Sequence, residues 1–218
     1  MPRLFSAGWL ATLLLGLVCP STSSPLLQQR LRPEEIVVSH LESIGPVKER
    51  AAVATRIISG TSQVIFRTEP VGQAGGRAVL ASEGSKILIG MSFQSSVYPR
   101  EHLGFNGTSF MAAFVTPGVR SMLGEFLMTH SLIFKQGLMS GTLSSAWPLL
   151  DLTARSTRLE YAGTKKFDNV TFHELRYLPP GGSDLKTSLF FDRETFRHVR
   201  TEYERVIAAP IGNRSYAN

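Results

Sequence analysis

Apolar and polar residues alternate along several stretches of the chain, which is the pattern of half-buried β-strands. The clearest stretch is 85–93, where every second residue is apolar and the residues between them are mostly small or polar. Runs rich in Val, Ile, Thr and aromatic residues extend the same pattern on both sides. The sequence therefore predicts strands over 53–67, 77–82, 85–93, 158–162, 170–177, 185–191 and 197–207.

Turn residues separate these stretches and predict hairpins between them. Asn106-Gly107 is the strongest of these signals, and Glu83-Gly84 is read as a tight turn. Lys165–Asn169 and Asp192–Thr195 lie between two further pairs of strands. Gly60 predicts a bend or bulge inside the first strand. The Gly-rich stretch 72–76 predicts a loop, because glycine weakens a strand interior.

Two regions have helical spacing instead. Pro33-Glu34-Glu35 places a proline and two carboxylates in the first turn of a helix that Gly45-Pro46 ends. One or two helices follow across 120–138, and an irregular segment over 137–150 is anchored by Trp147. The first helix has one apolar face, so it must pack on another element. His40 lies on the apolar face of the first helix or at its edge, where a packed or rim histidine is expected rather than a metal ligand.

These elements predict an α+β fold: a curved antiparallel sheet, an unclosed half-barrel, whose concave face is covered by the N-terminal helix and the central helical insertion. We expect one such domain over residues 33–207, followed by a polar tail over 208–218. No internal repeat is visible.

The first 24 residues have the order of a secretory signal peptide. Arg3 is followed by an apolar run from Trp9 to Val18, too short to span a bilayer, and then by small residues. The sequence thus predicts export, to the periplasm in a bacterium. Two alternatives remain: a retained anchor, and a lipoprotein acylated on Cys19, for which Val18 is a poor preceding residue.

Composition narrows the chemistry further. The 218 residues hold 23 Lys+Arg against 17 Asp+Glu, and the scattered basic residues do not favour nucleic-acid binding. A single cysteine excludes an internal disulfide. Gly-x-Ser-x-Gly and phosphate-binding motifs do not occur, and the histidines lack metal-binding spacing. We therefore expect no catalytic residue, no metal, no cofactor and no enzyme activity; the five histidines are His40, His102, His130, His173 and His198.

The sequence resembles the periplasmic lipoprotein-carrier superfamily (LolA, LolB and LppX-like proteins), as an exported member. The resemblance rests on the order of elements and on the hairpin Leu189-Phe-Phe-Asp192-Arg-Glu-Thr195-Phe-Arg-His-Val199; the stretches 101–107 and 137–150 are also similar to exported proteins of this broad type. It covers about residues 33–207. Family members run on for several more strands, so the sheet is expected to be short at its C-terminal end.

The resemblance implies an apolar cavity between the sheet and a helical lid, suited to acyl chains because each buried methylene contributes about 0.8 kcal/mol. The predicted partner is a lipid, a lipoprotein acyl chain or another hydrophobic ligand, bound by a monomer. A stripe of Arg197, Arg200 and Arg205 would allow transient contact with a membrane surface, unless Glu202 and Glu204 balance it. The candidate cavity wall consists of Ile87, Ile89, Met91, Phe93, Leu189, Phe191 and Tyr203.

The alternative is that the same apolar faces form an ordinary core. The protein would then be a structural or interaction protein of the cell envelope, with its interior filled by its own side chains and no ligand.

Overall fold

The computed structural model describes residues 31–67, 71–209 and 212–217, with side chains up to residue 205. Leu31–Asn218 form one compact unit. The predicted signal peptide, residues 1–24, and Cys19 within it lie outside the described residues.

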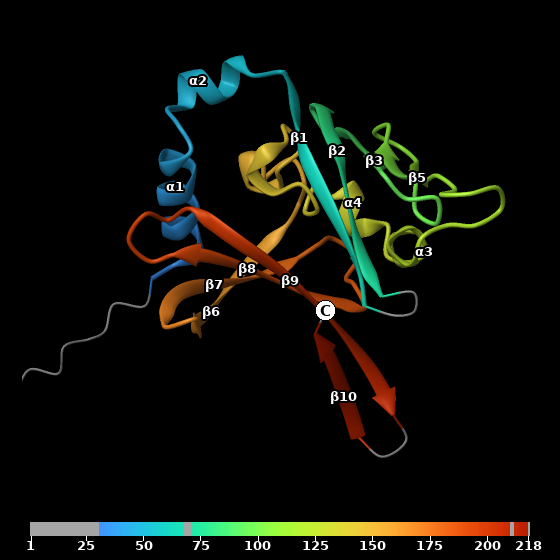
Figure 1. Ribbon diagram of the computed structural model, residues 1–218. Coiled ribbons are helices and arrows are strands. Elements are labelled where there is room, and N and C mark those ends of the chain that lie inside the picture. The colour runs from blue at the N-terminus through green and yellow to red at the C-terminus, as the bar shows by residue number, and fades with distance from the viewer. Residues whose placement is uncertain (1–30, 68–70, 210–211, 218) are drawn as a thin grey trace, which may run out of the picture. The chain divides into compact units, whose positions relative to one another are not determined.

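The described strands form two antiparallel sheets, and in each sheet strands that follow one another in the chain lie side by side (Figure 1). Sheet 1 consists of β1 (Thr55–Phe66), β2 (Gly72–Glu83), β3 (Lys86–Phe93), β4 (Arg100–Phe105) and β5 (Phe110–Ala112). Sheet 2 consists of β6 (Arg158–Phe167), β7 (Val170–Leu178), β8 (Leu185–Asp192), β9 (His198–Ala209) and β10 (Gly212–Ala217).

Short helices precede sheet 1 and separate it from sheet 2: α1 (Pro33–Ser43), α2 (Val47–Ala52), α3 (Met122–Thr129) and α4 (Leu132–Lys135), with 3₁₀ turns η1 (Gly141–Leu143) and η2 (Pro148–Leu150). The expected helix after Pro33 and the expected helices within 120–138 are confirmed. Glu35 helps to cap α1 by accepting from the amide of Arg32 (2.9 Å), and Ser121 caps α3 by accepting from the amide of Gly124 (2.8 Å).

One hydrophobic cluster joins both sheets to the helices. It includes Ile36 of α1, Leu103 of β4, Phe134 of α4 and Leu189 of β8, all of them fully buried. Trp147, from the irregular segment after α4, is buried in the same cluster. The α+β class and the unclosed antiparallel architecture predicted from the sequence are confirmed.

Four details differ from the expectation. The strands form two sheets rather than one, because the helical insertion interrupts the ladder between β5 and β6. Gly60 makes no bulge, since β1 pairs with β2 without a shift of register. The stretch 72–76 belongs to β2 rather than to a loop. Within the expected polar tail, β10 pairs with the end of β9.

Candidate functional site

Five of the seven residues predicted to line a cavity lie in or against the core. Ile87, Leu189 and Phe191 are buried in the cluster, while Ile89 and Tyr203 pack against it. Met91 and Phe93 are half-buried, and the ring of Phe93 lies 5.2 Å from that of Tyr98. The structure thus brings five of the seven to one cluster, together with large side chains from the helices.

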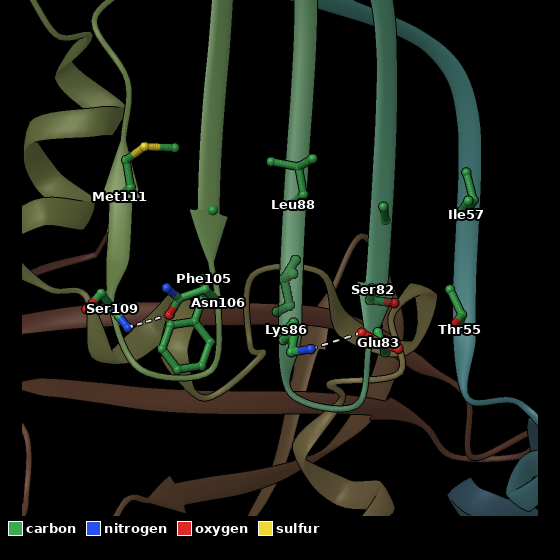
Figure 2. Close-up of a pocket in the computed structure, with 13 residues that line it drawn as sticks. Thr55, Ile57, Ser82, Glu83, Lys86, Leu88, Phe105, Asn106, Ser109 and Met111 are labelled. Carbon is green, nitrogen blue, oxygen red and sulfur yellow. Dashed lines mark hydrogen bonds and ion pairs between the residues drawn. The ribbon is translucent and has the colours of Figure 1, made fainter.

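A groove of about 600 Å³ lies on the opposite face of sheet 1, which we call the open face (Figure 2). One row of paired residues runs across all five strands there: Ile57, Ala81, Leu88, Gly104 and Met111. The side chains of Ile57, Leu88 and Met111 are 74%, 51% and 53% exposed. This alignment gives the groove a continuous apolar wall.

Small residues leave space in the row between its three large side chains. Ala81 lies between Ile57 and Leu88, and Gly104 lies between Leu88 and Met111. A Cβ atom at Gly104 would lie 3.7 Å from carbon atoms of both Leu88 and Met111, in ordinary van der Waals contact. A larger side chain at this position would therefore take up part of the groove.

Polar residues border the groove on the side of the hairpin turns. Thr55, Glu83 and Lys86 form the next row of the same face, and Asn106 and Ser109 come from the turn between β4 and β5 (Figure 2). Lys86 and Glu83 are 3.0 Å apart, but both are exposed, so their pairing contributes little to stability. The groove therefore has an apolar wall beside a polar border.

Local turn chemistry fixes this arrangement. Gly84 adopts a positive φ of 55° in the turn between Glu83 and Lys86. Asn106 accepts hydrogen bonds from the amides of Thr108 and Ser109, at 2.9 and 2.8 Å, and so closes the next hairpin. Both hairpins were predicted from these residues. Because the turns set the register, they align the row across the strands.

Sequence reasoning placed Leu88 correctly on the face opposite Ile87, but it did not identify that face as a site. Of the seven predicted wall residues, Ile87 alone also borders this groove. The signal available in the sequence was the presence of Ile57, Leu88 and Met111 at outward positions of alternate strands, β1, β3 and β5. Using it requires the pairing register, which alternation within a single strand does not supply.

A second feature is a group of aromatic and histidine side chains in the core. His40 is fully buried, its Nδ1 lies 2.9 Å from the carbonyl oxygen of Phe196, and its Nε2 lies 3.1 Å from Nε1 of Trp147. His198 packs on Trp147, with ring centroids 4.7 Å apart. Burial lowers the pKa of His40, and it lowers the pKa of His198 to about 4. Of the packed and rim positions expected for His40, the structure shows the packed one.

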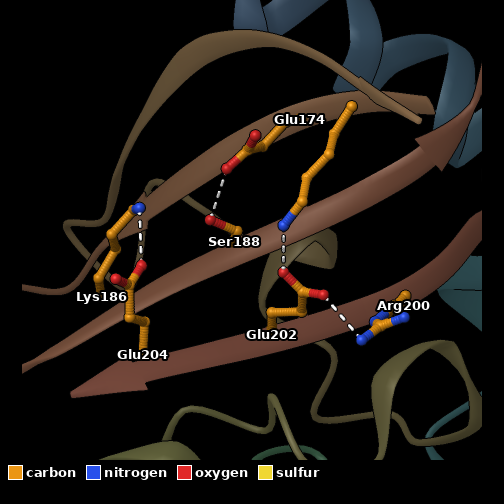
Figure 3. Close-up of polar contacts among 7 residues, drawn as sticks. Glu174, Lys186, Ser188, Arg200, Glu202 and Glu204 are labelled. Carbon is orange, nitrogen blue, oxygen red and sulfur yellow. Dashed lines mark hydrogen bonds and ion pairs between the residues drawn. The ribbon is translucent and has the colours of Figure 1, made fainter. Parts of the chain in front are cut away.

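The face of sheet 2 that carries Ser188 and Glu202 has balanced ion pairs (Figure 3). Glu202 lies 2.8 Å from both Lys165 and Arg200, and Lys186 lies 2.9 Å from Glu204. Ser188 donates a hydrogen bond of 2.7 Å to Glu174. Arg200 is therefore paired within the sheet, which favours the balanced strand face over a basic stripe.

Among the residues that the structure describes, no group of three His, Cys, Asp or Glu side chains is placed to hold a metal ion. Within the same residues, every helix is too short or too polar to cross a membrane.

No protein-family model matches the sequence, and no curated protein matches it. Solved structures do. A LolA superfamily protein from Nitrosomonas europaea has a TM-score of 0.41 and 8% identity, over 80% of this chain and 72% of the other. A DUF1329 family protein from Desulfovibrio piger has a TM-score of 0.41 and 9% identity, over 79% and 73%.

A protein domain from Vibrio parahaemolyticus, named for outer membrane lipoprotein sorting, has a TM-score of 0.39 and 10% identity over 83% of each chain. The chain shares at most 10% identity with these three proteins. At these identities its ligand has to be inferred from its own groove.

Proposed function

We propose that this chain is an exported, periplasmic, non-catalytic carrier or binding module that holds the acyl chain of a lipid or lipoprotein in the groove on the open face of sheet 1. The observation that supports this most is the apolar row that crosses all five strands of the sheet. A groove of about 600 Å³ is within the range of small-molecule sites, about 300–1,000 Å³.

The length of the row suits a membrane acyl chain. Adjacent strands lie about 4.8 Å apart, so a row from β1 to β5 spans about 19 Å. One leaflet of a bilayer has a hydrocarbon layer of about 15 Å, half of the total thickness. An acyl chain laid along the row would cover Ile57, Leu88 and Met111, and its polar end would remain near the polar border.

The alternative is an interaction protein of the envelope with a filled core and no ligand. Trp147, Phe134 and Phe191, all fully buried, occupy the region where a cavity under the helices was expected. Mass spectrometry of organic extracts from the purified protein separates the two functions. Co-purified lipid supports the carrier, whereas a stable protein partner without extractable lipid supports the alternative.

The direct test is titration of the purified protein with a fluorescent fatty acid, using variants of the row. We expect Leu88→Gln and Met111→Gln each to weaken binding about four- to twelvefold, because about half of the 1.5–3 kcal/mol from burying such a side chain is lost. Gly104→Val should also weaken binding, since it fills the groove without adding polarity.

Val170→Gln is the matched control, because Val170 is 47% exposed on sheet 2, outside the groove. It should bind like the unaltered protein, and thermal unfolding of every variant should show that the fold is retained. Saturable binding that no row substitution weakens would place the ligand elsewhere, and no saturable binding at all would contradict the proposal.

A further inference from the structure

Strand β1 forms one edge of sheet 1. All twelve of its residues, from Thr55 to Phe66, pair with β2 on one side. In the part of the chain that the structure describes, no strand pairs with its other side. An edge of this length presents a row of backbone donors and acceptors that another extended polypeptide complements.

The hydrogen-bond pattern shows which groups of β1 point outward. The amide of Gly84 donates to the carbonyl of Ala54 (3.4 Å). The backbone N–H and C=O of Ala54 therefore point toward β2. In an antiparallel ladder this orientation alternates from residue to residue. The outward backbone groups of β1 therefore belong to Thr55, Ile57, Ser59, Thr61, Gln63 and Ile65.

This edge lacks the features that usually prevent strand addition. It contains no Pro, no Lys and no acidic residue, and its one charged side chain, Arg56, bonds to the carbonyl of Thr142 (2.7 Å). Two of the three other described edges differ: β5 has three residues and contacts α3, and β6 carries Arg158, Glu160, Lys165 and Lys166. The free edge of β1 is thus long and unprotected.

The same strand forms one end of the groove. Thr55 and Ile57 line the groove with their side chains and point their backbone groups outward. Residues directly opposite each other in a ladder place their side chains on the same face. A residue added beside Ile57 would therefore extend the apolar row by one position, with its side chain on the open face.

We propose that β1 accepts an acylated polypeptide as an additional strand, so that the acyl group on a residue opposite Thr55 or Ile57 enters the groove along the row. This proposal rests on the proposed function and specifies its ligand as an acylated polypeptide rather than a free lipid. The backbone groups of the edge complement another polypeptide, and the groove that begins at the same two residues suits an acyl chain carried by it.

The test compares three probes: palmitate, a short synthetic peptide with a palmitoyl chain on its first cysteine, and the same peptide without the chain. We expect the acylated peptide to bind about tenfold more tightly than palmitate, the gain of one or two net hydrogen bonds. Ser59→Pro should abolish this gain and leave palmitate binding unchanged. Ser59 lies outside the groove, and proline is tolerated on an edge strand where the lost N–H faced solvent.

Ser59→Ala is the matched control, since it keeps the backbone N–H and should keep the tenfold gain. Equal affinities for palmitate and the acylated peptide, or a gain that survives in Ser59→Pro, would overturn strand addition alone. Failure of both acyl probes to bind would overturn the proposed function as well. A dimer in sedimentation that Ser59→Pro dissociates would assign the edge to a second copy of the chain and overturn this proposal.

Discussion

At the scale of single residues, His40 makes two hydrogen bonds that require a neutral ring. Its Nδ1–H donates to the carbonyl of Phe196, and its Nε2 accepts from the indole N–H of Trp147. A protonated ring has no acceptor, so protonation would break the bond to Trp147. Burial lowers the pKa of His40, the hydrogen bond to Phe196 raises it, and the positive charge of Arg50 lowers it further.

His198 leads to a prediction about pH. Burial is the largest cause that lowers its pKa from 6.5 to about 4, and the charge of the neighbouring His40 lowers it as well. A hydrogen bond with the backbone of Arg200 opposes this shift by raising the pKa. The unfolded chain therefore takes up a proton at higher pH than the folded protein. The stability due to neutral His198 is complete above pH 6.5 and declines as the pH falls toward 4.

We expect His198→Phe, which keeps an aromatic ring against Trp147, to reduce the loss of unfolding free energy between about pH 7 and about pH 4.5 by about 2 kcal/mol. Urea unfolding at both pH values measures this difference. Burial also lowers the pKa of His40 and His173. Both histidines therefore act in the same direction as His198, and the unaltered protein should be less stable at the lower pH. Parallel pH profiles for variant and unaltered protein would contradict the prediction.

At the scale of elements, β2 shows why a glycine-rich stretch can belong to a strand. A Cβ atom at Gly76 would overlap the carbonyl oxygen of Ser92 in β3, so no larger residue fits there without backbone movement. At Gly75 no atom lies within 4 Å of the same position. The two adjacent glycines therefore differ in what they permit.

This difference predicts unequal effects of the same substitution. Gly76→Ala should lower the unfolding free energy by more than about 2 kcal/mol. The added methyl group forces β2 and β3 either to move apart locally or to adopt a strained backbone. Gly75→Ala should change it by less than about 0.5 kcal/mol. Chemical denaturation of the two variants gives both values, and a tolerated Gly76→Ala would show that the sheet adjusts at this point.

Glycine also marks where prediction from sequence was incomplete. Turn signals such as Asn106-Gly107 identified hairpins correctly, because the side chain of Asn106 closes its own turn and needs no distant partner. The stretch 72–76 was assigned to a loop because glycine has low strand propensity, yet twelve consecutive pairs with β1 override that preference. The outcome depended on a partner strand that local propensity does not include.

At the scale of the whole molecule, the core and the candidate site use opposite faces of sheet 1. Ile87 and Leu103 face the core, where Trp147 and Phe134 fill the space between the elements, whereas Leu88 and Met111 face outward. Alternation over 85–93 predicted that Ile87 and Leu88 lie on opposite faces of their strand. It did not indicate which of them would be covered, because that depends on where the helical insertion packs.

Strand β1 belongs to both the groove and the free edge, so hydrogen exchange of its backbone amides shows whether a partner binds along that edge. The amides of Arg56, Ile58 and Gly60 face β2, and those of Ile57, Ser59 and Thr61 face outward. In the unliganded protein, we expect hydrogen exchange resolved by NMR to be at least about tenfold faster at the outward set. Adding the acylated peptide should slow the outward set alone, because only those groups gain partners; palmitate should leave it unchanged. Equal protection of both sets before any ligand is added would show that this edge is already covered.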